Sequence, residues 1–96
     1  MNRDEVLDQL ARNKPTLVAR YGVDRLALFG STVREAARAD SDIDILVSLD
    51  GPATSERYFG VQFFLEDLLG RPVDLDSDKA LRPELRPFIE REAVHV

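Results

Sequence analysis

Four residues in the first half of the chain combine types and spacing that suit phosphate and metal chemistry. Gly30 and Ser31 stand together, and Asp42 and Asp44 follow after ten intervening residues. Two residues apart on a strand, the aspartates project from the same face with Cα atoms about 6–7 Å apart. Carboxylates at that separation repel each other unless a cation lies between them. A small site of hard oxygen ligands favours Mg²⁺, which takes one or two carboxylates together with phosphate oxygens.

The Gly30-Ser31 pair offers the complementary half of such a site. It follows an apolar segment and precedes a stretch of helical character at about 33–38. Glycine lets a phosphate approach the backbone, and the free amides and dipole at the start of a helix attract anions. The Ser31 hydroxyl can donate to a phosphate oxygen, although the same hydroxyl can also cap the helix. The two halves together predict a nucleoside triphosphate held between backbone amides and a metal ion.

Further side chains could complete this site. Asp74 lies on a later extended segment and could act as a third metal ligand or help to remove a proton. Asp76 shares that face of the segment, so alternation alone does not choose between them. Arg34 and Arg38 are four residues apart and could contact the triphosphate or a partner. They could equally form a solvated face that pairs with nearby acidic residues.

The elements that must position these residues alternate between helical and extended patterns, which favours an α/β (α+β) domain. We expect strands at 25–29, 43–49 and 72–76 and a short edge strand at 93–96. We expect helices at 3–13 and 15–21, separated or restarted by Pro15, and further helices from 54 or 55 to 69 and at 83–92. The last helix is expected to bury Leu85, Phe88 and Ile89. The pairs Tyr58-Phe59 and Phe63-Phe64 are expected in the core more than in nucleotide stacking.

Composition narrows the class of protein. With 96 residues the chain forms one small domain, residues 1–96, and the absence of cysteine excludes disulfides and thiolate metal sites. The charged N-terminal segment is not a signal peptide, and no apolar run is long enough to span a bilayer. We therefore expect a cytoplasmic protein that does not contact membranes. A net charge of −5 argues against direct nucleic-acid binding.

The segment LFGSTVREAARADSDIDILV resembles the signature of the minimal nucleotidyltransferases, small members of the DNA polymerase β-like superfamily that include the MntA-type antitoxins. The segment GRPVDLD is similar to the family's third-carboxylate strand, with the match on Asp74, and RPFIEREAVHV is similar to its C-terminal end. Glu35 departs from the pattern, because many relatives carry a small residue there. The resemblance implies a small mixed sheet with helices packed mainly on one face.

The resemblance also implies an activity. By this resemblance Asp42, Asp44 and Asp74 would hold Mg²⁺, and Gly30 and Ser31 would bind ATP. Arg34 is a further candidate contact to the nucleotide, from its position after Gly30-Ser31. Because a domain this small has no room for an acceptor lobe, the hydroxyl should come from a partner. The family suggests a HEPN-type toxin, whose tyrosine would receive AMP in a type VII toxin–antitoxin module. Two alternatives stay open: a non-catalytic module that neutralises its partner by contact, and a transferase acting on RNA or a small molecule.

Overall fold

The structure, a computed structural model, describes residues 2–30, 42–52, 54–77 and 82–96. In these ranges the chain forms three helices and four strands. They run in the order α1 (Arg3–Tyr21), β1 (Val23–Leu28), β2 (Ile43–Leu49), α3 (Ser55–Leu69), β3 (Val73–Ser77), α4 (Arg86–Glu92) and β4 (Val94–His95). The helix expected at about 33–38 lies outside the described residues.

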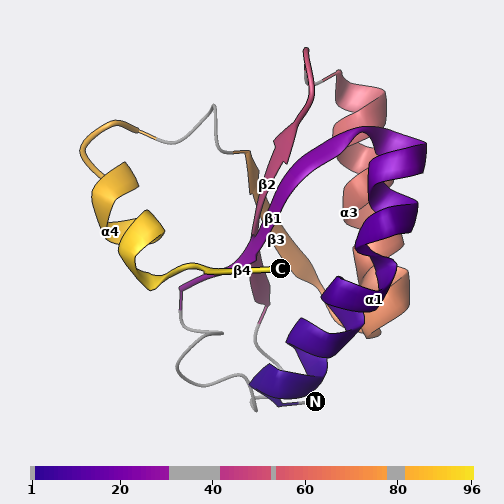
Figure 1. Cartoon of the computed structure of the whole chain (residues 1–96), viewed down its shortest axis with the longest axis horizontal. Coiled ribbons are helices and arrows are strands. Elements are labelled where there is room, and N and C mark those ends of the chain that lie inside the picture. Colours follow the sequence, from indigo (N-terminus) through magenta and orange to yellow (C-terminus); the bar gives the residue numbers. More distant parts are fainter. Residues whose placement is uncertain (1, 31–41, 53, 78–81) are drawn as a thin grey trace.

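The four strands form one mixed sheet in the order β3-β2-β1-β4. β1 pairs antiparallel with both β2 and β4, whereas β2 and β3 run parallel. Figure 1 shows α1 and α3 side by side on one face of the sheet and α4 on the other. The expectation of a small mixed sheet with helices mainly on one face is therefore confirmed.

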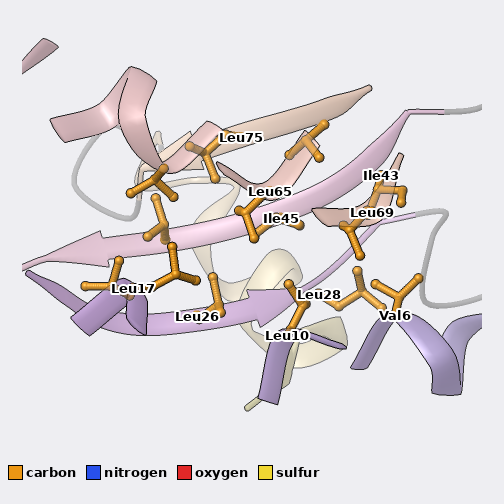
Figure 2. Close-up of a cluster of buried hydrophobic side chains, with 14 of the residues drawn as sticks. Val6, Leu10, Leu17, Leu26, Leu28, Ile43, Ile45, Leu65, Leu69 and Leu75 are labelled. Carbon is orange, nitrogen blue, oxygen red and sulfur yellow. The ribbon is translucent and has the colours of Figure 1, made fainter. Parts of the chain in front are cut away.

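The main hydrophobic core fills the space between the sheet and the pair α1 and α3 (Figure 2). Alternate residues of β2 enter this core, as the period of an extended strand requires. Val61, Leu65 and Leu69 of α3 pack against them at helical spacing. Gly22 and Gly70 end α1 and α3 in the left-handed conformation that glycine adopts without steric cost. Within the described residues, no helix is long and apolar enough to cross a membrane.

The expectation of two N-terminal helices is wrong, because α1 runs unbroken through Pro15. Proline removes the backbone N–H that would bond to the carbonyl four residues earlier. Leu10 and Leu17, on either side of it, are both fully buried in the main core. Burial of a whole apolar face outweighs one lost hydrogen bond, since tertiary packing supplies most of the stability of a protein helix.

The C-terminal helix also differs from expectation. Residues 83–85 form a turn, and α4 begins only at Arg86. Leu85 and Phe88 are 48% and 62% exposed, whereas Ile89 packs with Ala93 on a second small cluster. A helix of seven residues turns only one narrow stripe toward the sheet, and Ile89 occupies it.

The aromatic pairs on α3 divide between core and surface. Tyr58 and Phe64 pack against the main core, as expected. Phe59 and Phe63 are 50% and 64% exposed, so that part of the expectation is wrong. Their rings stack on each other with centroids 6.3 Å apart on the surface of the helix.

Candidate active site

The two aspartates of the spaced motif lie at the start of β2. Asp42 is exposed immediately before the strand, and Asp44 is half-buried within it. Ile43 and Ile45, which alternate with them, are fully buried in the main core. Apolar anchors on one face thus hold the carboxylates on the opposite face, the one that α4 partly covers.

The end of β1 brings Gly30 against this carboxylate pair. Leu28 pairs with Ile45, and the Phe29 amide donates to the Asp44 carbonyl at 3.1 Å. Gly30 follows with a φ of +69°, and a Cβ placed on it would lie 2.7 Å from Asp44 Oδ2. The backbone of the first half of the motif therefore touches the side chain of the second half.

The parallel pairing of β2 with β3 places the third carboxylate. Asp44 and Asp74 are direct partners across the two strands, about 4.8 Å apart in the pairing direction. Asp76 instead pairs with Leu46, two residues further from the start of β2. Register therefore favours Asp74 over Asp76, a choice that strand alternation left open.

Asp76 has a different electrostatic setting. Burial, and then the neighbouring Asp74 carboxylate, raise the pKa of the Asp76 carboxyl above its ordinary value. The shift shows that the Asp74 and Asp76 carboxylates repel each other when no cation lies between them.

The carboxylates of Asp42, Asp44 and Asp74 supply the oxygen donors that Mg²⁺ prefers. They lie on one face and at one end of two adjacent strands. Among the residues that the structure describes, no three His, Cys, Asp or Glu side chains are already gathered as a metal cage. Carboxylate oxygens are suitable donors for a cation, and the strand pairing sets Asp44 beside Asp74, so these residues fit a cation. Asp42 is exposed, immediately before β2.

Other site residues from the sequence fall outside the described ranges. These are Ser31, Arg34, Arg38 and the divergent Glu35. Their roles stay predictions, and Gly30 is the one residue of the predicted phosphate-binding pair Gly30-Ser31 that the structure describes.

Sequence reasoning missed a set of polar side chains on α3 that hold β3. The Tyr58 hydroxyl donates to the Leu75 carbonyl, and Gln62 Nε2 donates to the Val73 carbonyl at 3.3 Å. Glu66 Oε2 accepts from the Val73 amide at 3.0 Å. Their spacing of four residues was visible in the sequence, but polar residues at that spacing usually indicate only a solvated helix face.

A family model for the nucleotidyltransferase domain matches residues 5–95. Protein adenylyltransferase MntA of Thermococcus cleftensis is 36% identical over 93 residues, which cover 97% of this chain and 94% of that protein. A solved structure assigned as a minimal nucleotidyltransferase superposes with a TM-score of 0.80 at 38% identity, covering 98% of this chain and 95% of that one.

A chain of a more distant solved structure has the same fold, with a TM-score of 0.60 at 20% identity. That structure is a complex of a tri-AMPylated Shewanella oneidensis HEPN toxin with MNT antitoxin. The match covers 98% of this chain and 67% of the matched chain. With this fold, this sequence signature and relatives similar over nearly their whole length, the chain belongs to the nucleotidyltransferase domain family and, within it, to the minimal nucleotidyltransferases.

Proposed function

We propose that the chain transfers AMP from ATP to a hydroxyl of a partner protein, and so acts as the antitoxin of a type VII toxin–antitoxin module. One observation carries the chemistry: the Gly30 backbone, Asp44 and Asp74 adjoin at one end of the sheet. The similar adenylyltransferase MntA supports the reaction. The AMPylated HEPN toxin in the distant complex supports such a toxin as the acceptor, and the acceptor hydroxyl is proposed to belong to a tyrosine.

In the proposed reaction, the acceptor hydroxyl attacks the α-phosphorus of ATP. A new P–O bond forms while the bond to pyrophosphate breaks, and the hydroxyl proton leaves by way of Asp74. Asp42, Asp44 and Asp74 would hold Mg²⁺, which neutralises charge on the phosphate oxygens. Gly30 leaves room for the β- and γ-phosphates, with Ser31 donating to them and Arg34 as a further contact.

A second candidate function comes from a different surface. The stacked, exposed rings of Phe59 and Phe63 lie on α3, which covers the face of the sheet opposite Asp44. Exposed aromatic pairs are typical of contact sites, so the chain could neutralise a partner by binding it without catalysis.

Growth of cells that carry a HEPN-type toxin separates the two functions. Asp44→Asn removes one charge from the site, and Asp67→Asn removes one from the exposed surface of α3. If transfer is the mechanism, Asp44→Asn still co-purifies with the toxin but no longer protects the cells, whereas Asp67→Asn protects like the wild type. Full protection by Asp44→Asn would establish neutralisation by contact and overturn the proposed role of transfer.

A further inference from the structure

The strand that carries Asp74 lies at the edge of the sheet. Among the described residues, β3 pairs with β2 alone, in the strand order β3-β2-β1-β4. No described strand bonds to its other side, and an edge strand held along one side is free to shift or fray. A residue on such a strand needs further support if its side chain must be held in place for chemistry.

Helix α3 supplies that support along one stripe. Tyr58, Gln62 and Glu66 succeed one another at intervals of four residues, so they share one side of the helix. They bond to the Leu75 carbonyl, the Val73 carbonyl and the Val73 amide, respectively. The three contacts thus reach the backbone of the residues immediately before and after Asp74.

The hydrogen bonds of the stripe add to the apolar packing of α3, to which the Tyr58 ring also contributes. Val61, Leu65 and Leu69 are the buried residues of the helix and enter the main core. The stripe is only partly buried and contacts the free edge of β3. Its three directed hydrogen bonds all go to the backbone of two residues of β3, Val73 and Leu75.

We infer that the Tyr58, Gln62 and Glu66 stripe is a positioning device that clamps β3 and so holds the Asp74 carboxylate opposite Asp44. The inference rests on the proposed function for the role of Asp74. The stripe touches neither nucleotide nor acceptor in this scheme; it acts through the backbone that flanks one metal ligand.

Two measurements on purified protein test the clamp. Hydrogen exchange followed by mass spectrometry reports the protection of the β3 amides. Titration with Mn²⁺ in the presence of AMP-PNP, a nucleotide that does not react, reports the metal affinity. Tyr58→Phe removes one clamp bond and Glu66→Ala another, whereas Glu66→Gln keeps an oxygen that can accept from the Val73 amide.

We expect Tyr58→Phe and Glu66→Ala to speed exchange in residues 73–77 and to weaken Mn²⁺ binding roughly tenfold, as loss of a ligand's supporting contacts does. Glu66→Gln should remain close to the wild type, and so should Asp67→Asn, an exposed neighbour outside the stripe. A merely structural role would lower the unfolding temperature and leave the Mn²⁺ affinity of the folded protein unchanged. Gln62→Met provides a second clamp variant if either of the others fails to fold.

Unchanged Mn²⁺ affinity in folded Tyr58→Phe, Glu66→Ala and Gln62→Met would overturn the clamp. So would faster exchange spread over the whole sheet with no excess in β3, or a wild-type protein that binds no Mn²⁺. A wild-type protein that binds Mn²⁺ through Asp74 but transfers no AMP would instead overturn the proposed function and leave the clamp standing.

Discussion

The backbone of Gly30 lies against the carboxylate of Asp44, so closely that a Cβ on the glycine would come within 2.7 Å of Oδ2. The contact follows from the antiparallel pairing of β1 with β2, which sets Leu28 opposite Ile45. A chain that leaves β1 here and returns to β2 must bring its two ends together. The residues between Ser31 and Asp42 therefore belong to the connection between two paired strands. The pairing brings the two halves of the motif together.

Gly30→Ala should damage both stability and activity. An alanine at a φ of +69° is strained by about 1–2 kcal/mol, and its methyl group also displaces the Asp44 carboxylate. Gly70→Ala is the matched control, because Gly70 has a φ of +66° but open space where a Cβ would stand. We expect both variants to lose a similar free energy of unfolding in urea, and only Gly30→Ala to lose adenylyl transfer. Equal activity in the two variants would show that the contact with Asp44 has no functional role.

Asp74→Asn should impair transfer far more than Asp76→Asn. Asp74 is the direct partner of Asp44 across the parallel strands, whereas Asp76 stands opposite Leu46. We expect Asp74→Asn to lower kcat by about 10²–10⁴-fold, the usual range for loss of an acid–base group. Asp76→Asn should stay within a few-fold of the wild type. Steady-state kinetics on both variants decides the assignment, and a larger loss in Asp76→Asn would reverse it.

Arg57 should contribute to the free energy of unfolding but not to the rate of adenylyl transfer. Its guanidinium donates to the carbonyls of Tyr21 at 2.9 Å, Asp50 at 2.9 Å and Pro52 at 3.0 Å, and it also bonds the Asp50 carboxylate. These bonds join the end of α1, the end of β2 and the start of α3. They lie about 20 Å along β2 from Asp44, at about 3.3 Å per residue.

We expect Arg57→Ala to lower the free energy of unfolding by about 1–3 kcal/mol, because it removes several hydrogen bonds that a charged group donates to partly buried and exposed acceptors. Arg57→Lys should restore little, because an ammonium group cannot reproduce the planar fork of donors. Urea denaturation measures both variants, and kinetics below the unfolding transition should match the wild type. A loss of kcat in fully folded Arg57→Ala would show that the two ends of the sheet are coupled.

Tyr58 should give the protein a pH-dependent stability at alkaline pH. Burial, with smaller contributions from Asp76 and Asp74, raises the pKa of its phenol above the ordinary value near 10. The folded state therefore keeps the proton more tightly than the unfolded state. The contribution of the phenol is fully present below the unfolded pKa and is lost as pH rises through the folded pKa.

The stability difference between the wild type and Tyr58→Phe should accordingly be constant at neutral pH and shrink above about pH 10. Urea denaturation of both proteins across this range measures it, and the comparison cancels the titration of groups that the two share. A difference that stays constant to the highest pH at which both proteins fold would contradict the raised pKa of the Tyr58 phenol.

Much of this fold could be predicted from local pattern. β2 has the bounds that its alternation predicts, and the glycines at 22 and 70 end their helices as expected. The prediction of a helix break at Pro15 was wrong, because the sequence shows the missing hydrogen bond but not the core that holds Leu10 and Leu17. The prediction that Phe88 is buried was wrong, because hydrophobicity alone does not reveal that a short helix covers the sheet with one residue.

The candidate site shows the same division. The spaced aspartates and Gly30 could be found from types and intervals, because a strand and a turn are local structures. Strand alternation could not choose between Asp74 and Asp76; the family resemblance pointed to Asp74, and the register between β2 and β3, which depends on how distant segments pair, favours the same residue. The clamp on α3 was hidden, since its acceptors are backbone groups that a sequence does not distinguish.

The intact mass of a HEPN-type partner reports whether this protein transfers AMP to it. The partner is incubated with this protein, ATP and Mg²⁺, in parallel with Asp44→Asn and Asp67→Asn. We predict that the partner gains one or more AMP masses with the wild type and with Asp67→Asn, and none with Asp44→Asn. No gain with any of the common nucleoside triphosphates, from a folded protein that binds its partner, would contradict it.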